Sequence, residues 1–204
     1  MDRVLRKEYN MKINKSKTKV MECSRKKSGE AGNTRLRNGV LKEYCYLGSK
    51  ITNDGRSKED IKCRLTQARK SFLNQRNLRI SNIDIGIRKT FMKAFVWNMA
   101  LYGCETWTIT NSERKRMEAV EMWCYRRMLK VRWIHGITNG KILNQIGERR
   151  SIWLNLARRK DRMIGHVLRH PGVEQLVFEG SAGGKSGRGR PAYEYQQMWD
   201  AAVT

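Results

Sequence analysis

The stretch of sequence that decides the fold is residues 87–131, which read IRKTFMKAFVWNMALYGCETWTITNSERKRMEAVEMWCYRRMLKV. Apolar side chains recur in it every three or four residues, which is the spacing of one face of an α-helix. The first set is Ile87, Phe91, Phe95 with Val96, Met99 and Tyr102, and the second is Met117, Val120, Cys124, Met128 and Val131. Gly103 offers a left-handed stop between the two helices, and Asn111 or Ser112 can cap the second. We therefore expect an αα-hairpin whose two apolar faces are packed.

Further helices are expected on both sides of this hairpin. Ser57-Lys-Glu-Asp60 has the form of a capping box, and Ser81 and Asp84 repeat the signal ahead of residue 87. The helix after Ser57 has an apolar face of Ile61, Leu65, Ala68 and Phe72. Beyond residue 131 the pattern predicts helices at about 139–146, 151–169 (stopped by Pro171-Gly172) and 193–202.

Both ends of the chain differ from this helical part. Near the N-terminus the pattern predicts a strand at about 18–24 and a strand or hairpin arm at 40–52, closed by a turn at Asn53-Asp-Gly55. Residues 180–191 are basic and Gly-rich, and we expect them to be flexible. The predicted fold class is therefore mainly α, a helical bundle with a small N-terminal β hairpin and a basic C-terminal segment. The expected divisions are residues 1–55, 56–135, 136–172 and 173–204.

The net charge indicates the kind of partner. Lys and Arg number 43 against 19 Asp and Glu, which gives a formal charge of +24. Such an excess favours a polyanionic partner, of which nucleic acid is the commonest. An anionic membrane surface is the rival, but no segment approaches the ~20 apolar residues of a membrane span. The N-terminal residues lack the apolar run of a signal peptide.

Cysteine usage indicates a compartment. The five cysteines are spread singly, without a Cys-x-x-Cys pair, and an odd number does not complete a disulfide framework. We expect these thiols to be small buried hydrophobes in a reducing setting. The expected location is therefore intracellular, nuclear or cytoplasmic, and not secreted.

Basic and aromatic residues interleave between residues 97 and 133, a pattern that suits a groove that follows a nucleic-acid backbone. The alternative is that most of the rings belong to the core. Two arginines in Arg188-Gly-Arg-Pro191 can enter a narrow minor groove, or can simply neutralise phosphates. The candidate nucleic-acid-binding residues are Arg126, Arg127, Lys130, Arg132, Arg188 and Arg190.

Catalytic and metal-binding patterns are weak throughout the sequence. Two-metal nucleotidyl transfer needs carboxylates brought together, and no Asp stands beside another acid in an apolar strand. His166 and His170 are four apart on one helix face, but a helix C-terminal cation explains His170 more simply than zinc does. Gly183-Gly-Lys-Ser-Gly187 lacks the first glycine and the flanking elements of a phosphate loop. We assign no catalytic residue, no metal ligand, no cofactor and no small-molecule substrate.

Several motifs resemble one protein family. The chain is similar to the C-terminal part of the reverse transcriptases of non-LTR (LINE-like) retrotransposons, which are endonuclease–reverse transcriptases, over residues 8–199. The motifs are Asn14-Lys-Ser-Lys-Thr-Lys-Val-Met21, Tyr44-Cys-Tyr-Leu-Gly-Ser-Lys-Ile-Thr52, Leu101-Tyr-Gly-Cys-Glu-Thr-Trp107, Glu121-Met-Trp-Cys-Tyr-Arg-Arg-Met-Leu129, Gly165-His-Val-Leu-Arg-His170 and Gly187-Arg-Gly-Arg-Pro191.

The resemblance implies roles for particular stretches. Residues 8–23 resemble the end of a polymerase palm, and Asn14, Lys17 and Thr18 match the family's Asn-x-x-Lys-Thr motif. In that motif the lysine is thought to assist the leaving pyrophosphate. Tyr46, Leu47 and Gly48 resemble the primer grip, which holds the primer end against the active site. Residues 57–134 resemble the helical thumb, which closes on the template–primer duplex.

The departures from the family concern its catalytic part. The fingers, the first catalytic aspartate, the paired aspartates and the endonuclease domain have no counterpart in this sequence. Intact members of the family would use Mg²⁺ there. We therefore expect a noncatalytic, truncated reverse transcriptase (RNA-directed DNA polymerase) fragment that binds an RNA–DNA hybrid or duplex through phosphates. The alternatives are an intact polymerase cut short in its record, and a co-opted helical interaction module whose charge is incidental.

Overall fold

The computed structural model describes residues 7, 9–12, 14, 18–19, 21, 23, 41–79, 82–149, 151–170 and 172–178. Most of these residues are helical, and two short strands form a single antiparallel hairpin. The mainly α class with a small β hairpin is therefore confirmed at this coarse level. The chain divides into two compact units, Met1–Cys63 and Arg64–Thr204.

The hairpin of the first unit joins β1 (Glu43–Tyr46) to β2 (Ser49–Thr52), with Glu43 opposite Thr52 and Tyr46 opposite Ser49. Leu47 and Gly48 form its turn with φ values of 48° and 84°. A two-residue hairpin loop with positive φ at both positions matches the right-handed twist of the strands. The turn expected after β2 is also present, because the Gly55 amide donates to the Thr52 carbonyl at 3.0 Å. The region predicted as a strand or hairpin arm is thus a complete hairpin.

The strand expected at 18–24 is not seen in the residues that can be described there. Thr18, Lys19, Met21 and Cys23 have no strand assignment, and the others of that segment lie outside the described residues. Thr18 instead closes a local turn, since its amide and hydroxyl both donate to the Asn14 carbonyl, at 3.0 and 2.8 Å. The predicted loop at 25–38, the segment 180–191 and the helix at 193–202 also lie outside the described residues.

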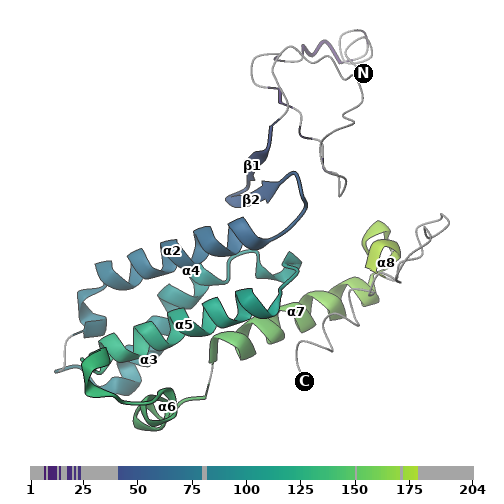
Figure 1. Ribbon diagram of the computed structural model, residues 1–204. Coiled ribbons are helices and arrows are strands. Elements are labelled where there is room, and N and C mark those ends of the chain that lie inside the picture. The colour runs from purple at the N-terminus through teal and green to yellow at the C-terminus, as the bar shows by residue number, and fades with distance from the viewer. Residues whose placement is uncertain are drawn as a thin grey trace. The chain divides into compact units, whose positions relative to one another are not determined.

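Ten further helical segments follow α2 (Lys58–Asn74) in the described part of the chain, and α8 is the last of them (Figure 1). They are η1 (Arg76–Arg79), α3 (Ile85–Met92), the π-helix η2 (Lys93–Trp97), α4 (Asn98–Ala100), η3 (Cys104–Thr106), α5 (Asn111–Met128), η4 (Trp133–His135), α6 (Asn139–Ile146), α7 (Ser151–Arg169) and α8 (Val173–Phe178). The bounds of α6 and α7 agree with the predicted helices, whereas α8 was not predicted.

The expected apolar faces of α2 and α5 are buried, except that Val131 lies beyond the end of α5 and is half-buried. Ile61, Leu65, Ala68 and Phe72 of α2 are at most 6% exposed, and the same side of α5 buries Met117, Val120, Cys124 and Met128. Gly103 has φ 71°, as a left-handed stop requires. The cap of α5 is Thr110 rather than Asn111 or Ser112, because Thr110 and Glu113 form a capping box.

The predicted packing of the first helix of the αα-hairpin was wrong for most of its apolar set, although Val96 is buried as expected and Phe91 is half-buried. The other side chains expected inside are exposed: Ile87 by 60%, Phe95 by 48%, Met99 by 40% and Tyr102 by 50%. The core takes Val96, as expected, and with it Met92, Trp97, Ala100, Leu101 and Cys104. The sequence carries two adjacent apolar rows, and the wider π turn of η2 lets the consecutive residues Val96 and Trp97 both face inward.

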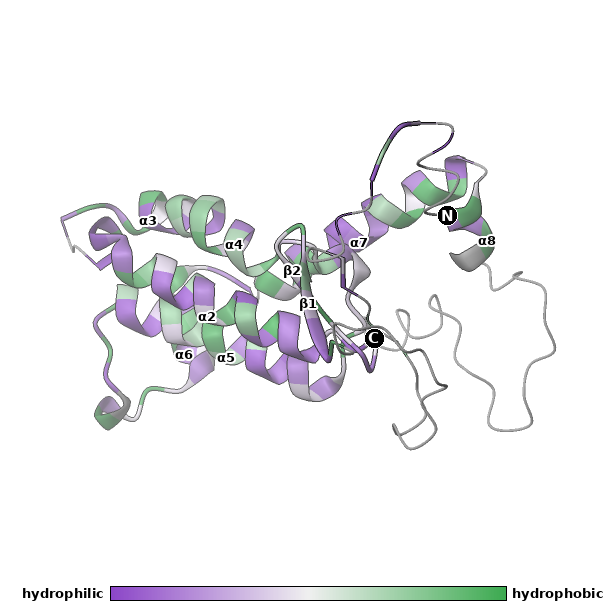
Figure 2. Ribbon diagram, turned by 90° about the horizontal axis from the view of Figure 1, so that it is seen from above, coloured by the Kyte–Doolittle hydropathy of each residue, from purple (hydrophilic) through white to green (hydrophobic). Residues whose placement is uncertain are grey.

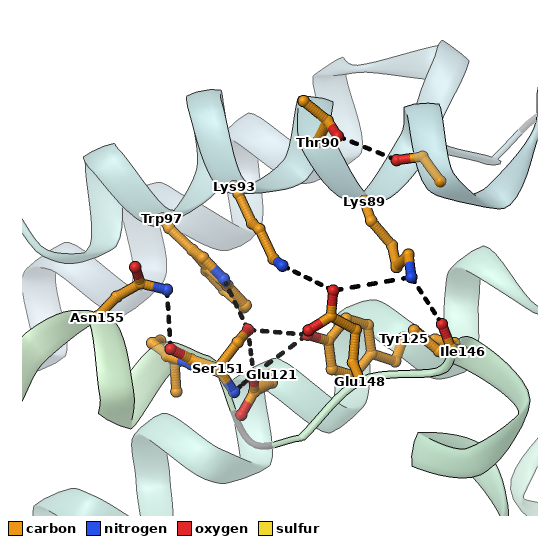
Figure 3. Close-up of polar contacts among 12 residues, drawn as sticks. Lys89, Thr90, Lys93, Trp97, Glu121, Tyr125, Ile146, Glu148, Ser151 and Asn155 are labelled. Carbon is orange, nitrogen blue, oxygen red and sulfur yellow. Dashed lines mark hydrogen bonds and ion pairs between the residues drawn. The ribbon is translucent and has the colours of Figure 1, made fainter.

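A buried carboxylate joins α5 to the start of α7 (Figure 3). Glu121 is 0% exposed, and its Oε1 accepts from the Ser151 amide at 2.7 Å, the Ser151 hydroxyl at 2.9 Å and the Ile152 amide at 3.1 Å. The Tyr125 hydroxyl donates to the same oxygen at 3.2 Å. Two otherwise unpaired amides of the first turn of α7 are thereby satisfied. Burial raises the pKa of Glu121, although these hydrogen bonds oppose the rise.

The five cysteines are all free, and they fall into two groups. Cys104 and Cys124 are buried in the helical unit, and desolvation raises the pKa of each to about 12. Cys23, Cys45 and Cys63 are exposed, so the expectation that all five thiols are buried was wrong for these three. Among the described residues, no helix has the length and apolar character needed to cross a membrane.

Candidate nucleic-acid interface

Three side chains from α2 and α5 form the cationic centre of the helical unit, which we call the Arg–Trp–Arg clamp. The Arg127 guanidinium carbon lies 4.4 Å from the centroid of the Trp123 ring, and that of Arg69 lies 5.6 Å from it. The Phe72 ring packs against the Trp123 ring in an edge-to-face arrangement, with the two centroids 5.3 Å apart. Arg69 and Phe72 are three apart on α2, and Trp123 and Arg127 are four apart on α5, so each pair shares a helix face.

The clamp has the electrostatic character of an anion site. Arg69 and Arg127 are both exposed, and neither has a carboxylate partner in the part of the chain that the structure describes. Their charges act on Cys124 beneath them and oppose the desolvation that raises the pKa of its thiol. A guanidinium stacked on an indole keeps its edge of N–H donors free for a planar or tetrahedral oxyanion. The arrangement can therefore hold a phosphate without first breaking an ion pair.

Other cations extend this surface along α5. Arg116 lies seven residues before Trp123 within α5, so both fall on the same side of the helix, and Arg116 is exposed. Lys130 is exposed too, but it lies beyond the end of α5. Lys130 follows the last turn of α5 with φ 58°, and its amide donates to the Arg127 carbonyl at 3.3 Å. The hydropathy colouring of Figure 2 shows hydrophilic segments recurring along α2 and α5. From Arg116 to Arg127 the row is about 17 Å long at 1.5 Å per residue, close to five base pairs of duplex.

The other predicted cations of this region have different surroundings. Arg126 is turned to the loop after α5, where its guanidinium donates to the Ile137 carbonyl at 2.7 Å and to Asn139 Oδ1 at 3.0 Å. Arg132 is exposed, and its amide donates to His135 Nδ1 at 3.2 Å. Of the four cations predicted between residues 126 and 132, the structure thus brings Arg127 into the clamp and places Lys130 one turn away. Arg188 and Arg190 lie outside the described residues.

The motif residues of the first unit form two separate local structures. Tyr46, Leu47 and Gly48 make the tip of the hairpin, where Tyr46 is 57% and Leu47 76% exposed. Asn14 and Thr18 share the turn described above, and Lys17 lies outside the described residues. An exposed apolar hairpin tip is suited to contact with a partner surface.

Arg69 was missed by the sequence analysis, although α2 itself was predicted. Its signal is its position three residues before Phe72 on a helix whose apolar face was recognised. The pairing with Trp123 spans more than fifty positions of sequence, and only the packing of α2 on α5 brings the two together. A basic position beside an apolar row becomes informative only once the neighbouring helix is known.

Metal-ligating groups do not cluster in the described residues. No set of three or more His, Cys, Asp or Glu side chains is placed to hold an ion there. His166 and His170 stack side by side at the end of α7 with ring centroids 4.5 Å apart. Comparison of the chain with protein-family models, with curated proteins and with solved structures found no match in any of the three.

Proposed function

We propose that the face formed by α2 and α5 binds the phosphate backbone of nucleic acid. The observation that carries this proposal is the Arg–Trp–Arg clamp, two guanidinium groups on one indole with no carboxylate partner in the described chain. The net charge of +24 supports it, because the long-range field draws polyanions to the whole molecule. Backbone contacts of this kind position a nucleic acid without reading its sequence.

We further propose the biological setting that the sequence motifs suggest. In this proposal the chain is the part of a non-LTR retrotransposon reverse transcriptase that contacts the template–primer duplex, and the helical unit has the role of a thumb. In this proposal the hairpin tip of Tyr46, Leu47 and Gly48 is the primer-grip element, and Asn14, Lys17 and Thr18 are the palm motif. The protein binds an RNA–DNA hybrid inside the cell and performs no nucleotidyl transfer by itself.

The test is fluorescence anisotropy with a labelled RNA–DNA hybrid at a series of salt concentrations. The double substitution Arg69→Gln/Arg127→Gln removes two phosphate contacts, so the slope of log K against log[salt] falls in magnitude by about 2. Trp123→Leu keeps both charges but removes their platform, so affinity falls while the slope changes little. Circular dichroism of each variant checks that the helices are retained.

The matched control is Arg158→Gln, which removes an exposed arginine from α7, away from the clamp. Its slope stays close to that of the unmodified protein, apart from a small general effect of net charge. A double variant whose slope equals that of the control would remove the clamp from the interface. Equal affinity for hybrid, duplex DNA and polyphosphate would leave only a general polyanion binder and would overturn the reverse-transcriptase setting.

A further inference from the structure

The side of the helical unit formed by α3, η2 and α4 carries an exposed apolar row, which we call the α3–α4 stripe. It consists of Ile87, Phe91, Phe95 and Met99, and the rings of Phe91 and Phe95 lie 4.6 Å apart. Three of these side chains are 40–60% exposed, and Phe91 is half-buried. Hydrophobic colour predominates from α3 to α4 in Figure 2. A contiguous row of large apolar side chains on a surface marks a contact site.

The polar neighbours of the stripe are already bonded within the helix. The Thr90 hydroxyl donates to the Gly86 carbonyl at 3.1 Å, and the Asn98 amide group donates to the Ala94 carbonyl at 2.7 Å. Asn98 Oδ1 in turn accepts from Arg159. The Thr90 hydroxyl proton and the Asn98 side-chain oxygen are thus already used within the protein. An occupant of the stripe therefore gains mainly from burying apolar surface rather than from polar contacts.

The π turn keeps this row on the outside. In η2 the helix takes an extra residue per turn between Lys93 and Trp97, and Val96 and Trp97 are both buried while Phe95 is left exposed. Single π turns within α-helices are rare and are frequently found at functional sites. The two apolar rows of the helix are thus used separately, one for the core and one for the surface.

The border of the stripe is cationic. Residues 85–100 contain Arg88, Lys89 and Lys93 and no acidic residue. Arg88 is buried and donates to the Met128 carbonyl at 2.8 Å. Lys89 and Lys93 stand on the side facing α6 and α7, where Glu148 approaches them at 3.7 and 2.6 Å (Figure 3). Two lysines share one carboxylate, so that border keeps a net positive charge. Lys89 also donates to the Ile146 carbonyl at 2.8 Å and its side chain is only 19% exposed, so the accessible cation is mainly Lys93.

From these features we propose that the α3–α4 stripe is the docking surface for an amphipathic helix of another protein, with an apolar face bordered by acidic residues. The stripe from residue 87 to residue 99 is about 18 Å long, which matches three to four turns of such a helix. The acidic border complements the accessible Lys93 and suits the net charge of +24. That same charge opposes a second copy of this chain as the occupant.

The experiment uses a designed, fluorescein-labelled peptide of 16 residues as the probe. It carries leucines at helical spacing on one face and glutamates on both borders. A scrambled peptide of the same composition spreads its leucines around the helix, so it has the same charge but no apolar face. Anisotropy titration of the full chain is expected to give at least ten-fold tighter binding of the first peptide, because only that peptide can bury the stripe.

Two surface substitutions test where the peptide binds. Phe95→Ser and Ile87→Ser each weaken binding of the first peptide by about ten-fold, as expected for large apolar anchors. Leu154→Ser, at a leucine of α7 that is 46% exposed, leaves binding unchanged. Because Phe95 and Ile87 are exposed, circular dichroism should show all three variants folded. The clamp variant Arg69→Gln/Arg127→Gln is expected to retain peptide binding. The peptide experiment therefore tests this inference independently of the nucleic-acid proposal.

Three outcomes would overturn the inference. Equal binding of the designed and scrambled peptides would mean simple charge attraction to the protein. Binding that survives Phe95→Ser would place the peptide elsewhere. A concentration-dependent dimer in sedimentation experiments that disappears in Phe95→Ser would make a second copy of the chain the occupant instead.

Discussion

At the scale of single residues, Glu121 is the side chain with the most demanding environment. Its Oε1 accepts four hydrogen bonds, whereas its buried Oε2 has no hydrogen-bond partner among the described residues. A charged oxygen without a partner is costly inside a protein, and protonation lowers that cost. This is the physical reason that burial raises the pKa of Glu121 in spite of the bonds from α7.

The raised pKa of Glu121 predicts a pH-dependent contribution to stability. The folded state holds the proton more tightly than the unfolded chain, whose carboxyl titrates near 4.5. The contribution is fully present below that pH and is lost as pH rises from 4.5 through the folded pKa. Glu121→Gln cannot ionise, so the unfolding free energy of the unmodified protein falls relative to that of the variant over this window. The relative loss is at most about 1.4 kcal/mol per pH unit.

Urea unfolding followed by circular dichroism at several pH values between 4 and 8 measures this difference. Glu174→Gln, at an exposed carboxylate of α8, is the control for removing one negative charge. A difference between the protein and Glu121→Gln that stays constant with pH would contradict the prediction.

Residue roles were the hardest property to predict from the sequence. Arg126 and Arg127 are adjacent and chemically identical, yet one holds a loop carbonyl and the other lies on Trp123. Glu121 falls within a predicted helix but beside its apolar row, and its cap on α7 joins residues thirty positions apart. Such pairings depend on how two helices pack, and no local pattern encodes them.

At the scale of elements, the start of α5 depends on a reciprocal cap. The Thr110 amide donates to Glu113 Oε2 at 2.6 Å, and the Thr110 hydroxyl donates to the same oxygen at 2.7 Å. Thr110→Ala removes the side-chain half of this cap and is expected to lower the unfolding free energy by about 1 kcal/mol. Chemical denaturation measures the loss, and Lys115→Ala, at an exposed site of the same helix, should change it little.

The coupling between the two capping residues is also measurable. Thr110→Ala/Glu113→Ala should cost less than the two single changes added together, because each single change already breaks the shared bonds. Strict additivity would show that the two side chains act separately.

Elements were predicted better than their orientations. The repeat of apolar residues located α2, α5, α6 and α7 because each carries one clear apolar row. The segment from Ile87 to Tyr102 carries two rows one position apart, and periodicity alone cannot rank them. Tertiary packing chose the row that contains Trp97 and Leu101, and the π turn accommodated the choice.

At the scale of the whole molecule, the two units differ in how much they bury. Buried apolar side chains of the described residues begin at Ile61 and continue to Leu156, whereas all four residues of β1 are exposed. A two-stranded hairpin is marginally stable in water unless something covers it. Composition predicted a small core and a basic helical protein, but it cannot reveal how unevenly that core is distributed.

Limited proteolysis should report this difference. Trypsin has sites throughout a chain with 43 Lys and Arg, so the order of cleavage reflects local opening rather than the availability of sites. Mass spectrometry is expected to show cuts up to about residue 55 before any cut within α2, α5 or α7. Early fragments that contain the intact hairpin and end inside one of those helices would contradict this expectation.

The labelling rate of the two buried thiols of the helical unit can report how often that unit unfolds. Cys104 and Cys124 lie in the core, and the burial that raises each pKa to about 12 removes nearly all of the reactive thiolate. An alkylating reagent therefore marks them only in molecules whose helices have come apart. Cys23, Cys45 and Cys63 are exposed and give the same sample an immediate reference. The rate at which the last two sites become labelled records how often the bundle opens, with no ligand, dye or enzymatic activity required.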